Sequence, residues 1–122
     1  AYDYDLATGS VNNRRIAITI PTDQGSPDGM TIDSEGMLWI AHWGGWQVAR
    51  WNPVTGEKLL SIPVPASQVT SCTFGGPNLD KLFITTARVG LDAAQLNDQP
   101  HAGGLFCTEV GVKGLPVVPF RG

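Results

Sequence analysis

The chain has 122 residues, the length of one ordinary domain, and a formal net charge of −3 from 8 basic and 11 acidic residues. It has no Lys/Arg run, so nucleic acid is not an expected partner. Its apolar runs are far shorter than the roughly 20 residues that span a bilayer, so a membrane is not an expected partner either. Its 15 Gly and 9 Pro interrupt any helical period. The sequence therefore predicts an all-β fold, with helix restricted to a turn near residues 91–96.

The N-terminal segment predicts two strands, at residues 2–5 and 15–20, with a turn at Ala7-Thr8-Gly9 between them. The chain begins inside such an alternating pattern, without Met and without the charged and apolar regions of a signal peptide. We therefore expect a piece of a longer protein, in which residues 1–20 are the last two strands of a preceding structural unit.

Residues 21–64 are expected to form one four-stranded unit, with Asp28 just ahead of its first strand. Its strands are predicted at residues 29–33, 37–41, 46–51 and 58–64. Residues 65–122 repeat this plan, with a long loop over residues 88–104 and strands predicted at 69–74, 81–87, 105–110 and 115–120.

The two units are related by an offset of roughly 43 residues, which separates Asp28 from Ser71 and, to within one residue, Trp39 from Phe83. Four strands per unit at this spacing are typical of a β-propeller blade, although an unrelated β-sandwich remains an alternative. Two and a half blades would be only part of a closed ring. The exposed blade edge is expected to meet upstream blades of the same protein or a second copy.

In an up-and-down blade, successive connections alternate between the two faces of the disc, and the first strand lines the central channel. Asp28 and Ser71 are therefore expected at the channel mouth, on the face formed by the loops at residues 21–28, 42–46, 65–71 and 88–104. A carboxylate there could bind a hard cation or act as a general base. Pro-Asp-Gly is also ordinary turn chemistry.

Further candidates for substrate contact share that face: His42, Trp43, Trp46, Ser71 and His101. The histidines could assist proton transfer, the tryptophans could form a wall for a small substrate, and the serine could donate a hydrogen bond. Each residue also has a purely structural interpretation, as a surface-loop histidine or a tryptophan that covers the sheet edge. Trp39 is expected to pack between blades.

The two cysteines are expected to be free. Cys72 and Cys107 fall on the first and third strands of one blade, about 10 Å apart, which is too far for a disulfide. We expect mostly buried thiols and a reducing compartment, the cytoplasm. The chain has no C-x-x-C pair, H-E-x-x-H, G-x-S-x-G, P-loop or dinucleotide-binding glycine motif, which removes most competing enzyme classes.

Four ordered motifs make the chain recognisable over nearly its whole length: Pro-Asp-Gly-Met-Thr-Ile-Asp at residues 27–33, Gly-x-Leu-Trp-Ile-Ala at 36–41, Thr-Ser-Cys-Thr-Phe-Gly-Gly at 70–76, and Ala-Gly-Gly-Leu-Phe at 102–106 with Gly-Val-Lys-Gly at 111–114. Together they resemble the regucalcin (senescence marker protein) and gluconolactonase family. The resemblance implies a six-bladed propeller of which this chain is the C-terminal portion. It also implies one divalent cation, often calcium, with zinc or manganese accepted, and hydrolysis of sugar lactones.

The family's Pro-Asp-Gly aspartate, a metal ligand and presumed general base, matches Asp28. The family's other ligands, a glutamate and an asparagine, and its substrate-binding arginine and asparagine have no match here and would lie upstream of Ala1. Calcium takes 6–8 oxygens, so the isolated chain is expected to be inactive. The leading hypothesis is the C-terminal part of a metal-dependent sugar-lactone hydrolase. The alternatives are a non-catalytic half-propeller scaffold and a related propeller esterase or phosphotriesterase.

Overall fold

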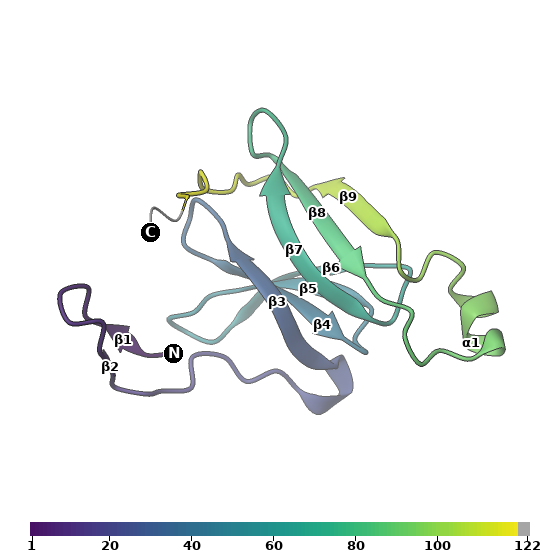
Figure 1. Ribbon diagram of the computed structural model, residues 1–122, viewed down its shortest axis with the longest axis horizontal. Helices are drawn as coiled ribbons and strands as arrows, with labels where there is room; N and C mark the ends of the chain where they lie inside the picture. The colour runs from purple at the N-terminus through teal and green to yellow at the C-terminus, as the bar shows by residue number, and fades with distance from the viewer. Residues whose placement is uncertain (120–122) are drawn as a thin grey trace.

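Figure 1 shows a computed structural model of the chain, in which residues 1–119 are described. Three antiparallel sheets follow one another in chain order. The first has two strands, the second four and the third three, with these bounds: β1 (Asp3–Tyr4) and β2 (Val11–Asn12); β3 (Ser26–Ile32), β4 (Leu38–Trp43), β5 (Gln47–Trp51) and β6 (Lys58–Pro63); β7 (Val69–Gly75), β8 (Lys81–Thr86) and β9 (Leu105–Glu109). The all-β prediction is confirmed.

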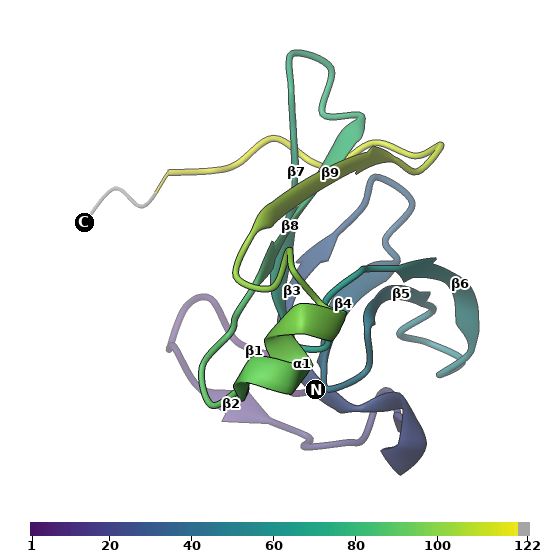
Figure 2. The ribbon, with the colours of Figure 1, turned by 90° about the vertical axis from the view of Figure 1, so that its right-hand side faces the viewer.

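The main core lies between the second and third sheets, which are seen side by side in Figures 1 and 2. Alternate residues of β4 and β8 point into it, so that Trp39, Leu82 and Ile84 are essentially inaccessible to solvent. The Trp39 ring meets the ring of Phe74 edge-on at 5.9 Å between centroids. Trp39 therefore packs between the two sheets, as predicted.

The opposite face of the second sheet is only partly covered. Ile18 and Ile20 pack against Ile40 and Trp51, while Met30 on β3 stays 54% exposed. An apolar groove of about 690 Å³ remains between the N-terminal segment and this sheet. Part of the apolar surface of this face therefore remains exposed to solvent.

Two predicted strands are wrong. Residues 15–20 form no strand, because Ile18 and Ile20 pack on the face of the second sheet instead of pairing, and the observed N-terminal pair is β1 with β2. Residues 115–119 form no strand either, and Phe120 lies outside the described residues. The chain is drawn away from β9 at Gly114, whose N–H donates to the Leu79 carbonyl at 2.8 Å and which bridges to Asp33. The assignment of residues 1–20, 21–64 and 65–122 to successive blades stays a prediction.

The predicted turn near residues 91–96 is a short helix, α1 (Ala93–Asp98), visible in Figure 2. Asp92 caps it by accepting from the Gln95 N–H, while the Gln95 side chain accepts from the Asp92 N–H. A 3-10 turn also forms at Thr22–Gln24. Among the described residues, no helix is long and apolar enough to cross a membrane.

Both cysteines are free, as predicted. Cys72 is buried and donates to the Trp39 carbonyl at 3.3 Å, and burial raises the pKa of its thiol to about 12. The expectation of burial is wrong for Cys107, which is exposed. Its neighbour Phe106 points to the core, so the alternation of β9 turns Cys107 to the uncovered face.

Candidate functional site

Asp28 lies on a β-bulge within β3. Pro27 pairs with His42 and Met30 with Ile40, so two residues of β3 face one residue of β4. The bulge turns Asp28 outward, and its side chain is exposed. Within residues 1–119, no hydrogen bond or ion pair reaches the Asp28 carboxylate. All of its lone pairs are therefore free for a cation or a proton.

The strand beside the bulge is β7, and a glycine allows the two strands to touch. A Cβ on Gly29 would collide with the Ser71 side chain and lie 2.8 Å from the Thr70 carbonyl oxygen. Any side chain at position 29 would therefore push β3 and β7 apart. Because this contact is so close, Ser71 lies next to the Asp28 bulge.

His42 is fully buried beneath this face and is not at its surface. Its Nδ1 is 2.8 Å from the Gln24 carbonyl oxygen, and its Nε2 accepts from the Trp51 indole N–H at 3.4 Å. The two rings stack with 6.0 Å between their centroids. Burial lowers the pKa of His42, which outweighs the opposing hydrogen bond to Gln24, and the nearby Lys58 charge lowers the pKa further. Both ring nitrogens are therefore occupied, and because Nε2 accepts a hydrogen bond, the ring is neutral.

The two tryptophans lie at the β4–β5 connection. Trp43 is half-buried, pairs with Ser26 and bridges to Gln68 in the next loop. Trp46 is 43% exposed and has φ 58°, a left-handed conformation that is costly for a bulky residue. Trp46 is thus the aromatic candidate that presents its side chain to solvent.

The loops predicted to share a face do contact one another. The Gly44 N–H donates to the Ser67 carbonyl at 2.9 Å, and the Gln68 side chain donates to the Val89 carbonyl at 2.9 Å. His101 is exposed in a separate open pocket of about 400 Å³, together with Arg88. Within the part of the chain described, no hydrogen bond or ion pair joins His101 to Asp28.

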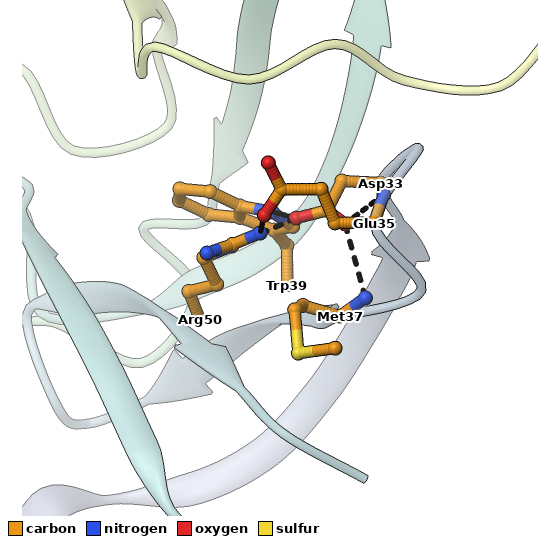
Figure 3. Close-up of polar contacts among 5 residues, drawn as sticks. All are labelled: Asp33, Glu35, Met37, Trp39 and Arg50. Atoms are coloured by element: carbon orange, nitrogen blue, oxygen red, sulfur yellow. Dashed lines mark hydrogen bonds and ion pairs between the residues drawn. The ribbon is translucent and has the colours of Figure 1, made fainter.

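The sequence reasoning missed a buried polar cluster at the other end of β3, shown in Figure 3. Asp33 is inaccessible to solvent, and its Oδ1 accepts from the N–H groups of Glu35 and Met37 at 2.9 and 3.0 Å. Its Oδ2 accepts from the Trp39 indole at 2.9 Å and from Arg50 Nε at 2.8 Å. The sequence feature that could have indicated this cluster is the position of Asp33 at the end of a predicted strand, three residues before the turn glycine Gly36 and six before Trp39.

Burial would raise the pKa of Asp33, but the hydrogen bonds from Arg50, Trp39 and the backbone outweigh it and leave the pKa below its usual value. Arg50 also contacts Glu35 at 2.6 Å, and its own pKa is raised, because the two carboxylates outweigh its burial. All acceptors of Asp33 are occupied, so this cluster holds the turn together and leaves no position for a ligand.

A metal site would need more than this chain's described residues supply. Within residues 1–119, no group of three His, Cys, Asp or Glu side chains is arranged to hold an ion. The free, outward carboxylate of Asp28 suits a hard cation as a single ligand. Calcium would take its remaining oxygen ligands from elsewhere.

The family described as "SMP-30/Gluconolactonase/LRE-like region" matches residues 1–88. Among curated proteins, regucalcin of Sus scrofa is 46% identical over 123 residues, covering 100% of this chain and 41% of the relative. Regucalcin of Danio rerio is also 46% identical, with 42% of its length covered. The chain thus spans about two fifths of the length of these relatives.

Solved structures give the same result. A luciferin-regenerating enzyme superposes with a TM-score of 0.81 at 39% identity, covering 93% of this chain and 38% of that protein. A calcium-binding protein, regucalcin of Agrobacterium tumefaciens, gives a TM-score of 0.84 at 31% identity, covering 93% and 39%. The predicted fold, part of a six-bladed β-propeller, is confirmed.

Proposed function

Because the chain belongs to the SMP-30/gluconolactonase family, we propose that it is part of a divalent-cation-dependent sugar-lactone hydrolase to which it contributes Asp28. One observation supports this above all others. The aspartate of the family-like Pro-Asp-Gly motif lies exposed on a β-bulge, and no described side chain engages its carboxylate.

Asp28 would do two things in this reaction. One carboxylate oxygen would bind the cation, and the carboxylate would accept a proton from the water that attacks the lactone carbonyl carbon. The bond from water oxygen to carbon forms, the ring ester C–O bond breaks, and the proton passes to the departing hydroxyl oxygen. A bound divalent cation would supply polarisation of the carbonyl. Trp46 is the exposed aromatic on this face that could contact the sugar ring.

The activity would require upstream blades. Met30 and Ile32 on β3 are 54% and 41% exposed, beside the apolar groove described above. A further blade packed there would bury this surface. The same upstream segment would bring the missing oxygen ligands to Asp28. Calcium is the expected cation, with zinc or manganese as the other candidates, and the two free thiols support a cytoplasmic location.

The decisive variant is Asp28→Asn in the complete protein, assayed with gluconolactone in calcium. Because an amide cannot accept the water proton, turnover should fall by about 10²–10⁴-fold. Asp23→Asn is the matched control, since Asp23 is an exposed aspartate five residues earlier, in the 3-10 turn that leads to β3. Turnover of Asp28→Asn near that of the control would refute the proposal.

Two alternatives are distinguished by simple measurements. A non-catalytic half-propeller that self-associates is favoured by the uncovered apolar face, and it would sediment as a dimer or larger species without lactonase activity in the complete protein. A propeller esterase or phosphotriesterase would prefer such substrates over lactones in a chelator-controlled panel.

A further inference from the structure

We propose that His42 is a positioning residue for Asp28, acting as a neutral imidazole with its proton on Nδ1 and holding the preceding loop by the Gln24 carbonyl. The proposal builds on the role of Asp28 given above. His42 itself is buried and touches neither substrate nor cation.

The hydrogen-bond partners select one tautomer. A carbonyl oxygen only accepts, so Nδ1 must donate to Gln24 across 2.8 Å. An indole N–H only donates, so Nε2 must accept from Trp51 across 3.4 Å. The Gln47 side-chain nitrogen lies 3.3 Å from Nδ1 and would need the opposite tautomer. That tautomer would place the Nδ1 lone pair against the lone pairs of the closer Gln24 oxygen. The shorter contact, to Gln24, therefore determines that the proton is on Nδ1.

Gln24 is held from two directions. Its peptide oxygen accepts a hydrogen bond from His42 Nδ1, and its side-chain oxygen accepts from Lys58 Nζ at 2.6 Å. The backbone of Gly45 presses against the same carbonyl, since a Cβ on Gly45 would collide with the Gln24 oxygen and lie 2.7 Å from the His42 Cβ. His42 thus fixes a peptide group that is closely enclosed.

This anchor lies directly before the bulge. Gln24 is four residues ahead of Asp28, and Pro27 pairs with His42 itself in the β3–β4 register. His42 therefore sets the start of β3 twice, through its side chain and through its backbone. Losing the side-chain contact leaves Gln24 without its donor and releases the segment that leads to Asp28.

The test compares His42→Asn with His42→Leu in the complete protein. The Asn amide can donate to the Gln24 oxygen as Nδ1 does, whereas Leu is of similar size and has no donor. We expect His42→Asn to bind calcium within about twofold of the parent and His42→Leu to bind about 10-fold more weakly, the scale of an outer-shell loss.

Two readouts are independent of metal and activity. Hydrogen exchange of metal-free protein should accelerate at residues 24–28 in His42→Leu and be restored in His42→Asn. Nitrogen chemical shifts of the unmodified protein should report a protonated Nδ1 and a bare Nε2 for His42 at neutral pH. Equal exchange in both variants, or a His42 with its proton on Nε2, would overturn the proposal even if His42→Leu folds poorly.

These outcomes are separable from those of the proposed function. If Asp28→Asn leaves calcium affinity and lactonase turnover unchanged, the function is wrong. The exchange and tautomer results still decide whether His42 holds the loop.

Discussion

Two aspartates lie in opposite surroundings near the two ends of β3: Asp28 in its first half and Asp33 directly after its last residue. Asp33 is inaccessible to solvent and accepts four hydrogen bonds, including one from Arg50 at 2.8 Å. Asp28 is exposed on a bulge, and within residues 1–119 nothing donates to its carboxylate. A satisfied carboxylate stabilises the fold, whereas an unsatisfied one is available for chemistry.

The comparison also shows how the free carboxylate is kept in place. The Asp33 cluster fixes the far end of β3, and the contact of Gly29 with β7 fixes the near end. At the Asp28 end of β3 the backbone is therefore held in place, while the Asp28 side chain is exposed to solvent. Changes at the two ends should therefore separate stability from activity.

The largest effect is expected for Asp33→Ala. It leaves Arg50, whose side chain is only 14% exposed, and the Trp39 N–H without their buried acceptor. Breaking a buried pair in this way costs about 3–5 kcal/mol. Urea unfolding would measure the loss, and a cost below 1 kcal/mol would show that the cluster does not hold the turn.

The next effect is expected for Gly29→Ala. The added Cβ meets the Thr70 carbonyl at 2.8 Å as well as the Ser71 side chain, so β3 and β7 must separate. Overpacking of this kind costs about 1–3 kcal/mol. Adding Ser71→Ala should not restore the stability, because the Thr70 backbone oxygen remains. Full rescue by that second change would place the conflict on the serine alone.

Acid should destabilise the protein through Asp33. Its folded pKa lies below the unfolded value of about 3.9, so its contribution is complete above that pH and is lost as pH falls through the folded pKa. Asp33→Asn should therefore show a shallower loss of stability below about pH 4 than the parent. Asp3 and Asp5, whose pKa values are also lowered, remain in both proteins and cancel. Parallel acid curves would contradict this assignment.

The smallest effect is expected for Glu35→Gln. Its carboxylate contacts Arg50 at 2.6 Å, but the side chain is 61% exposed, so water competes with the pair. Such surface pairs contribute about 0–1 kcal/mol. A loss similar to that of Asp33→Ala would mean that Arg50 depends on both carboxylates equally.

Local sequence patterns predicted strands well in segments that are bounded by turns and whose side chains alternate between the core and the solvent. The same pattern failed at residues 15–20, because isoleucines that pack on the face of a sheet alternate like isoleucines that pair. The final predicted strand failed because Gly114 is drawn towards Asp33 and Leu79, contacts between segments far apart in the sequence.

The site was predictable in its residue but not in its geometry. The Pro-Asp-Gly motif singled out Asp28, yet its bulge depends on Gly29 meeting a strand some 40 residues later. The burial of His42 depends on the Gln24 loop folding over it, and no local pattern encodes that contact. The Asp33 cluster did leave a signal, an aspartate closely followed by a turn glycine and a tryptophan.

The role of Asp28 as a cation ligand is best tested by calcium titration of the complete protein, with Asp28→Asn compared to Asp23→Asn and thermal unfolding recorded for both. We expect Asp28→Asn to lose calcium binding while its unfolding temperature without calcium matches that of the parent, because within residues 1–119 no group donates to the Asp28 carboxylate. Asp23→Asn should bind as the parent does. Calcium binding of parental strength by Asp28→Asn would show that Asp28 is not a ligand of the cation.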